Sequence, residues 1–184
     1  MNRYQMLQDL LPVLSDHLVV CNIGAPSQEL FALGDRPGNF YMLGTMGLAS
    51  SIGLGLALAQ ERPVIAIEGD GAVLSNLGTL ATIANNPRGN FTLLIVDNAS
   101  YGSTGDQPTW TAGRTSLAAV ARGCGCAAVV ECPADRAAAA LRAALDSPEM
   151  TVIVARCESG NVKVPVVDMN PVAMRLRFME AVRR

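Results

Sequence analysis

The stretch VIAIEGDGAVLSNLGTLATIANNPRGNFTLLIVDNASYG, residues 64–102, decides the fold of this chain. It opens with an apolar run that leads into the triplet GDG at 69–71 and then into a helical pattern. A second apolar run, FTLLIV at 91–96, leads into a polar segment that begins with Asp97 and Asn98. Two buried strands joined by a helix predict a parallel β–α–β unit. Both polar turns then lie at the carboxyl edge of the sheet, where open α/β sheets bind ligands.

Strand and helix patterns continue to alternate on both sides of this unit. Repeated alternation predicts an α/β fold with a doubly wound, mainly parallel sheet and helices on both faces. No linker or internal repeat divides the chain, so we expect a single domain over residues 1–184. The expected strands are 17–21, 40–43, 64–68, 91–96, 127–131 and 151–155, and the expected helices are 4–15, 28–33, 46–60, 72–85, 116–122, 134–145 and 171–182.

Composition and charge exclude several classes of function. The formal net charge is −2 without a run of like charges, which does not favour a nucleic-acid or anionic-membrane partner. The most apolar stretch, residues 46–59, is shorter than the ~20 residues of a membrane span, and the amphipathic N-terminus does not resemble a signal peptide. Five cysteines without a CxxC pair and one histidine do not favour a zinc or iron–sulfur site. We expect a cytoplasmic protein with reduced thiols.

The two polar turns carry the residue types of a magnesium site. Asp70 and Asn98 offer hard oxygen ligands, which suit Mg²⁺ or Ca²⁺ rather than zinc. One carboxylate and one amide are too few for a protein-only site, and Mg²⁺ commonly shares its coordination with phosphates. The glycines beside Asp70 permit a close backbone approach to such an anion. Each turn taken singly could also be an ordinary loop start.

Taken together with LGTMG at 43–47, these turns resemble the GDG-to-Asn signature of thiamine-diphosphate enzymes. The resemblance implies that the side chains of Asp70 and Asn98 and the carbonyl of Ser100 bind Mg²⁺. It also implies that the Gly44 carbonyl accepts a hydrogen bond from the pyrimidine amine, and that Met46 forces the bent cofactor conformation; core packing of Met46 is compatible with this role. The implied cofactor-binding residues are Gly44, Thr45, Met46, Gly69, Asp70, Gly71, Ala72, Asn98, Ser100, Tyr101 and Gly102. The turn at 22–27 is a weaker candidate for contacts with the diphosphate.

One component of these enzymes has no counterpart here. They activate the cofactor with a glutamate from a separate pyrimidine-binding domain. The acidic residues of this chain outside the motifs lie in helices or loops where solvated side chains are expected. We therefore expect a separate pyrimidine-binding α subunit to supply the activating glutamate. The acids considered are Glu29, Glu61, Glu131 and Glu149.

A narrower resemblance rests on residues 27–58 and on DNASYGSTGDQPT at 97–109. These runs look like the small β subunits of sulfopyruvate decarboxylases and are similar to phosphonopyruvate decarboxylases. The resemblance implies a carboxy-lyase subunit, active only with a partner, that converts 3-sulfopyruvate to sulfoacetaldehyde and CO₂. The long loop 97–114 is functional or disordered, and its part 101–111 is either a substrate cover or a flexible surface loop. Its candidate substrate donors are Ser103, Thr104, Gln107 and Thr109.

The sulfonate of such a substrate must face fixed hydrogen-bond donors or cations when it is buried. No Arg or Lys follows Tyr101 until Arg114, so we expect the main cation to come from the partner. Asp106 and Ala72 depart from the family pattern, and we expect Asp106 to face solvent because it would repel an anion.

The sequence is also compatible with other functions. The chain could act on phosphonopyruvate or another 2-oxoacid, or could bind cofactor only to regulate an assembly. A ferredoxin-linked oxidoreductase subunit would usually bring cluster-binding cysteines. Gly53-x-Gly55 lies within an expected helix and lacks the dinucleotide-binding context, and there is no P-loop.

Overall fold

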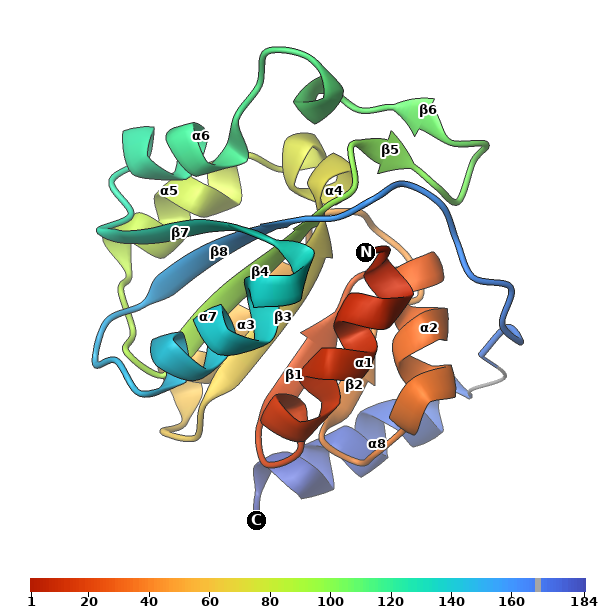
Figure 1. Ribbon diagram of the computed structural model, residues 1–184. Coiled ribbons are helices and arrows are strands. Elements are labelled where there is room, and N and C mark those ends of the chain that lie inside the picture. The colour runs from red at the N-terminus through yellow and green to blue at the C-terminus, as the bar shows by residue number, and fades with distance from the viewer. Residues whose placement is uncertain (168–169) are drawn as a thin grey trace.

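The computed structural model describes residues 1–167 and 170–184. Its main feature is a six-stranded sheet with the order β2-β1-β3-β4-β8-β7, in which every pairing is parallel (Figure 1). This confirms the expected α/β class. The strands are β1 (Leu18–Cys21), β2 (Asn39–Tyr41), β3 (Val64–Gly69), β4 (Phe91–Asp97), β7 (Ala128–Pro133) and β8 (Thr151–Arg156).

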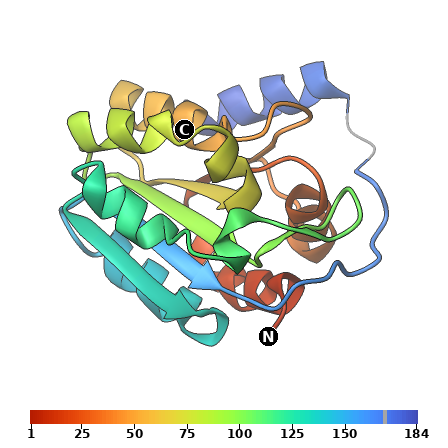
Figure 2. The same ribbon diagram turned by 90° about the horizontal axis from the view of Figure 1, so that it is seen from above.

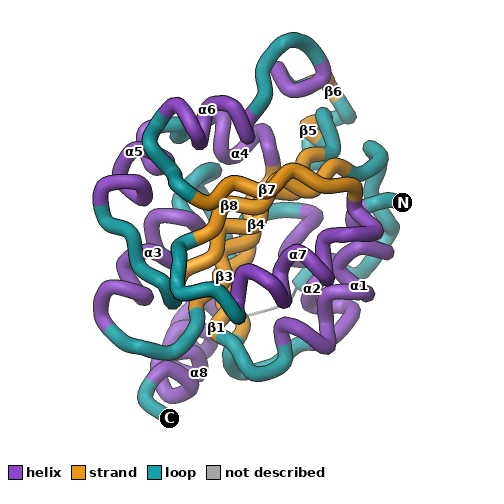
Figure 3. Tube along the Cα trace, turned by 60° about the vertical axis from the view of Figure 1, so that its left-hand side comes forward, coloured by secondary structure: helices purple, strands orange, loops and turns teal. Residues whose placement is uncertain are grey.

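Helices cover both faces of the sheet (Figures 2 and 3). One face packs against α1 (Arg3–Leu14), α2 (Ala25–Gly34) and α7 (Ala137–Leu145). The other packs against α3 (Ala49–Ala59), α5 (Gly78–Asn85) and α6 (Leu117–Gly123). The last helix, α8 (Pro171–Val182), contacts the edge strand β2 and contributes to both cores.

The central strands are apolar because both of their faces are buried. Every residue of β4 is buried. Its alternate side chains enter opposite cores, with Leu93 and Ile95 on the α3 side and Leu94 and Val96 on the α1 side. Such continuous apolar runs are typical of parallel sheets covered by helices.

Two predicted helices, at 46–60 and 72–85, have different boundaries in the structure. The helix expected at 46–60 begins only at Ala49, because Thr45 and Gly47 have φ angles of 63° and 78°, in the left-handed region. The helix expected at 72–85 is two helices, α4 (Asp70–Ser75) and α5. Asn76 leaves the helical conformation between them, and its side chain donates to the Gly47 carbonyl at 2.8 Å.

The loop expected at 97–114 is ordered. It contains a short antiparallel hairpin, β5 (Ser100–Tyr101) and β6 (Gln107–Pro108), followed by the 3₁₀ turn η1 (Trp110–Ala112). A second 3₁₀ turn, η2 (Ala134–Arg136), precedes α7. Among the described residues, no helix is both long and apolar enough to span a membrane.

Candidate functional site

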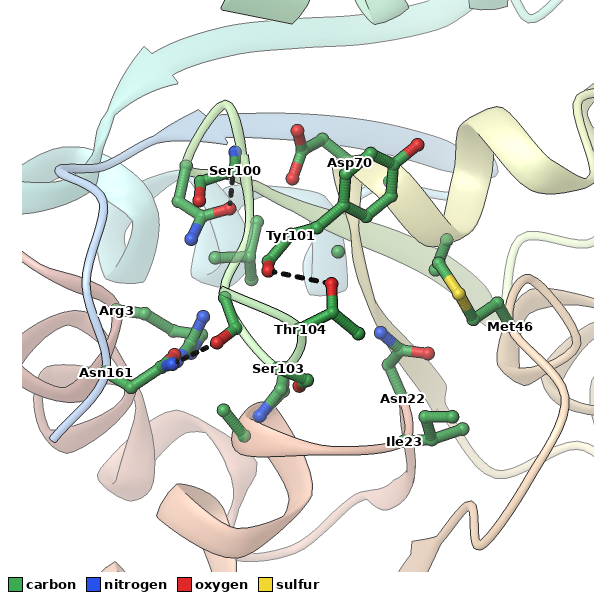
Figure 4. A pocket seen from close by; sticks show the side chains of 18 residues that line it. Arg3, Asn22, Ile23, Met46, Asp70, Ser100, Tyr101, Ser103, Thr104 and Asn161 are labelled. Carbon is green, nitrogen blue, oxygen red and sulfur yellow. Dashed lines mark hydrogen bonds between the residues drawn. The ribbon is translucent and has the colours of Figure 1, made fainter. Parts of the chain in front are cut away.

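A pocket lies at the carboxyl end of the sheet, where the strand order reverses. From β1 the chain continues to β2 on one side, whereas β3 pairs on the other side of β1. The turns that follow β1 and β3 therefore diverge and leave a crevice between them. The pocket is lined by parts of the segments 22–26, 69–72 and 98–104, and by Arg3, Met46 and Asn161 (Figure 4).

Asp70 is the buried acid of this pocket, with 1% of its surface exposed. Because Gly69 pairs with Val96, the ends of β3 and β4 lie side by side, as the sequence predicted. The Oδ2 atom of Asp70 accepts hydrogen bonds from the hydroxyls of Thr109 and Thr111 at 2.5 and 2.9 Å. Burial raises the pKa of the Asp70 carboxyl, and the two hydroxyls oppose that shift. A cation bound at Oδ1 would stabilise the ionised form in this setting.

Three potential metal ligands converge here, one each from Asp70, Asn98 and Ser100. One terminal atom of the Asn98 amide lies 3.1 Å from Oδ1 of Asp70 and 2.9 Å from the carbonyl oxygen of Ser100. As an amide nitrogen it would donate to both; as Oδ1 it accepts from the Ser100 N–H at 3.3 Å and completes a cluster of three oxygens. Neighbouring oxygens of an octahedral Mg²⁺ site with ~2.1 Å bonds are ~3 Å apart. The donor set therefore fits Mg²⁺.

Gly71 leaves room beside the GDG turn for the ring of Tyr101. A Cβ atom on Gly71 would lie 2.3 Å from Cε1 of Tyr101, whose ring covers this turn. With six residues, α4 is too short to act through a helix dipole, so an anion here depends on individual N–H groups. Across the pocket, Oδ1 of Asn22 is buried and has no hydrogen-bond partner among the described residues. A polar ligand would satisfy this acceptor only by donating to it.

The Gly44–Met46 segment forms the open side of the site. Met46 lines the pocket with 38% of its surface exposed. Gly44 and Thr45 are exposed in the same loop but do not line the pocket, and a Cβ on Gly44 would meet no atom within 4 Å. The conformation of this loop is set by Gly47, on which a Cβ would lie 2.6 Å from the Ala72 carbonyl oxygen.

The structure separates the candidate substrate donors. Ser103 and Thr104 line the pocket, and a Cβ on Gly24 would lie 2.6 Å from the Ser103 hydroxyl. Gln107 is exposed outside the pocket and hydrogen-bonds to Thr104. Thr109 was expected to be a substrate donor, and the structure differs: this residue is buried, and its hydroxyl donates to Asp70.

The expectation that Asp106 faces solvent is confirmed. It is exposed at the tip of the hairpin and accepts a hydrogen bond from the Ser100 hydroxyl at 3.1 Å. Its φ of 57° lies in the left-handed region, where Asn and Gly are favoured. Asn or Gly would therefore also fit at this position.

The sequence analysis missed a buried ion pair beside the pocket. Glu29 was expected to be solvated, but only 1% of its surface is exposed, and Arg3 contacts both of its carboxylate oxygens, at 2.7 and 2.9 Å. Arg3 also donates to Asn161, which lines the pocket. No local pattern joins these residues. The other acids considered, Glu61, Glu131 and Glu149, are exposed as expected.

The fold and site together define a class of protein: a parallel α/β domain with an Mg²⁺-compatible oxygen cluster and a pocket at the switch point of the sheet. Residues 27–155 match the family model for the C-terminal TPP-binding domain of thiamine pyrophosphate enzymes. The chain belongs to this family.

Individual relatives within this family are similar to the chain over most of its length. The chain is 45% identical over 184 residues to a sulfopyruvate decarboxylase subunit beta from Methanococcus maripaludis, covering 100% of this chain and 99% of the relative. It is 40% identical to a phosphonopyruvate decarboxylase from Streptomyces hygroscopicus, covering 94% of this chain but 43% of the relative. The crystal structure of benzoylformate decarboxylase from Polynucleobacter necessarius has the same fold, with a TM-score of 0.66 at 18% identity over 89% of this chain and 34% of the other.

Proposed function

We propose that this chain is the β subunit of a thiamine-diphosphate- and Mg²⁺-dependent decarboxylase that converts 3-sulfopyruvate to sulfoacetaldehyde and CO₂. The observation that carries the cofactor assignment is the position of one terminal atom of the Asn98 amide, which lies 3.1 Å from Oδ1 of Asp70 and 2.9 Å from the Ser100 carbonyl oxygen. The substrate assignment is supported by similarity to a sulfopyruvate decarboxylase β subunit along nearly its whole length. We further propose that the protein works in the cytoplasm, where its five free cysteines would remain reduced.

The roles of the residues follow from their places in the pocket. Asp70, Asn98 and the Ser100 carbonyl would hold Mg²⁺, which would anchor the diphosphate. Backbone N–H groups at Gly69–Ala72 and Tyr101–Gly102 would bind its oxygens. Gly44, Thr45 and Met46 would hold the pyrimidine end, where the Gly44 carbonyl would accept a hydrogen bond. When bound, thiamine diphosphate supplies the nucleophilic carbon and the electron sink for decarboxylation.

A partner subunit would complete the open side. Met46 and the neighbouring Leu43 are 38% and 57% exposed, an apolar surface next to the pocket that a second chain would cover. We expect this α-type subunit to bring the activating glutamate and the main cation for the sulfonate. Among the described residues, Arg3 is the cation that lines the pocket, and its charge is already paired with Glu29.

The test is a reconstitution. The chain is mixed with a candidate partner from a neighbouring gene, and CO₂ release is measured with 3-sulfopyruvate, phosphonopyruvate, pyruvate and other 2-oxoacids. The proposal expects the highest kcat/KM with 3-sulfopyruvate. Preference for phosphonopyruvate would favour the similarity to that decarboxylase instead. Cofactor binding without turnover of any 2-oxoacid would favour a regulatory subunit.

A further inference from the structure

The segment 157–167, which follows β8, crosses one end of the pocket. Figure 1 shows it passing between the start of α1 and the β5–β6 hairpin. Near its beginning, Cys157 N donates to Asp97 O at 2.9 Å and Glu158 N donates to Met1 O at 3.0 Å. Further along, Asn161 reaches the pocket itself. The segment therefore joins the N-terminal helix to the loop that carries the metal-binding oxygens.

The hydrogen bonds around Asn161 have only one possible direction. Arg3 donates from Nη2 to Oδ1 of Asn161 at 2.7 Å, and a guanidinium cannot accept. The opposite atom, Nδ2, then donates to the carbonyl oxygen of Gly102 at 2.6 Å. Glu29 holds Arg3 with two further bonds, and its Oε1 also accepts from the Val162 N–H at 3.1 Å. A buried ion pair thus determines which way an exposed amide points.

By holding the Gly102 carbonyl, Asn161 sets the orientation of the peptide bond between Gly102 and Ser103. Because a trans peptide is planar, the N–H of Ser103 points opposite to the Gly102 carbonyl, and therefore away from Asn161. Among the described residues, none accepts a hydrogen bond from this N–H. Residues 102–104 line the pocket, so this donor lies in a segment that forms part of the pocket wall. The contact is close, since a Cβ on Gly102 would lie 2.6 Å from Oδ1 of Asn161.

We propose that Asn161, oriented by the Arg3–Glu29 ion pair, is a positioning residue for the Gly102–Thr104 turn, which presents its Ser103 N–H to a diphosphate group. This inference rests on the proposed function and adds a part of the chain remote in sequence from the cofactor motif. The same turn follows Ser100, whose carbonyl belongs to the oxygen cluster. Loss of the Asn161 contact should therefore weaken diphosphate binding without removing any group that touches the ligand.

The first measurement is calorimetry on the full chain with Mg²⁺ and inorganic pyrophosphate, repeated with thiamine diphosphate in the presence of the partner. Asn161→Ala should raise the Kd for both ligands about tenfold, the equivalent of ~1.4 kcal/mol. Asn161→Asp should raise it further, because its carboxylate would face the Gly102 carbonyl. The control is Glu158→Gln, three residues earlier, which removes an exposed ion pair with the N-terminus but does not touch the turn. It should leave the Kd unchanged.

Two further readouts separate positioning from a general loss of structure. Amide hydrogen exchange in Asn161→Ala should accelerate at residues 102–104 and remain unchanged in β3 and β4. Gly102→Ala should weaken binding in the wild-type background, where the new methyl group meets Asn161, and much less in the Asn161→Ala background. In the assembled enzyme, the KM for thiamine diphosphate should rise while kcat at saturating cofactor stays within about twofold.

The outcomes are distinct. Wild-type affinity for Mg²⁺-pyrophosphate in both Asn161 variants would overturn the positioning role and leave the proposed function intact. Additive effects of Gly102→Ala and Asn161→Ala would also overturn it. A wild-type chain that binds no thiamine diphosphate with its partner present would overturn the proposed function itself and, with it, the ligand assigned to the turn.

Discussion

The two ends of the pocket differ in how completely this chain builds them. One end, at the oxygens of Asp70, Asn98 and Ser100, is called the metal end after the ion proposed for it. The other is the open side at residues 43–46. At the metal end, Asp70 is buried and its Oδ2 is held by two threonine hydroxyls, so the carboxylate has a defined orientation. On the open side, Leu43 and Met46 expose 57% and 38% of their surfaces. Under the proposed function, this chain would orient the metal and the diphosphate by itself, and a partner would complete the pyrimidine end.

The difference has a structural origin. The metal end is built on the ends of two adjacent central strands, β3 and β4, which the sheet holds rigidly. The open side is a loop. It is held at Gly47, whose carbonyl accepts a hydrogen bond from the side chain of Asn76 between α4 and α5. Sites on strand ends are positioned more accurately than sites on loops. A partner that packs on the loop would supply the missing constraint.

The largest effect should come from the metal end. Asp70→Ala removes the carboxylate of the oxygen cluster, and we expect the affinity for Mg²⁺-thiamine diphosphate to fall at least about 100-fold, or ~2.7 kcal/mol. Calorimetry in the presence of the partner measures this loss, and circular dichroism checks the fold. Asn98→Ala, which removes a neutral ligand, should cost less. The control is Asp135→Ala, an exposed acid in η2. Normal cofactor affinity in a folded Asp70→Ala protein would refute the metal assignment.

The need for a partner on the open side is tested by assaying the chain alone. The chain alone should turn over 3-sulfopyruvate at least about 100-fold more slowly than the pair, because a positioned acid–base group commonly contributes 10²–10⁴-fold. CO₂ release with and without the partner measures the ratio. Steady turnover by the homogeneous chain would contradict the two-subunit proposal.

A moderate effect should come from the threonines that orient Asp70. Thr111 contacts Asp70 at 2.9 Å and Asp97 at 2.7 Å, and links the ends of β3 and β4. Thr111→Val keeps the shape but removes this hydroxyl, and we expect Mg²⁺-pyrophosphate affinity to fall at least about tenfold, since hydrogen bonds to charged groups contribute ~1.5–3 kcal/mol. The same change at Thr82, on the exposed face of α5, is the control. Equal affinities would mean that Asp70 is held without the threonine.

The smallest effect concerns Glu68, which is fully buried and accepts a hydrogen bond from Ser50 N at the start of α3. Burial raises the pKa of Glu68 above its ordinary value of 4.5, so the folded chain keeps this proton to a higher pH than the unfolded chain. The stability that the neutral carboxyl contributes is present below pH 4.5 and is lost as the pH rises through the raised pKa.

Glu68→Gln removes this titration. The thermal midpoint of the variant relative to wild type should therefore rise between pH 4 and pH 8, with about 2–4 °C for each kcal/mol. Scanning calorimetry across this range measures the difference. A pH-independent difference would show that the carboxyl does not titrate in this window.

Much of the fold was predictable because its signals are local. The apolar runs at 64–68 and 91–96 and their glycine-rich ends identify parallel strands and the edge at which ligands bind. The helices at 46–60 and 72–85 were predicted with wrong boundaries, because left-handed residues and the Asn76–Gly47 contact interrupt them. Thr109 was misassigned for a similar reason, since its burial against Asp70 depends on how the loop folds back over β3.

By itself the sequence determined the α/β class, the place of the GDG turn and of Asn98, and the family to which they point. Strand periodicity, turn residues and motif spacing are properties of neighbouring residues, and they survive without knowledge of the fold. Only the tertiary structure decided that Glu29 is buried against Arg3 and that Asn161, 158 positions from Arg3, meets it at the pocket. Such contacts depend on how separate elements pack, because burial of a charge is tolerated only where the folded chain brings its partner to it.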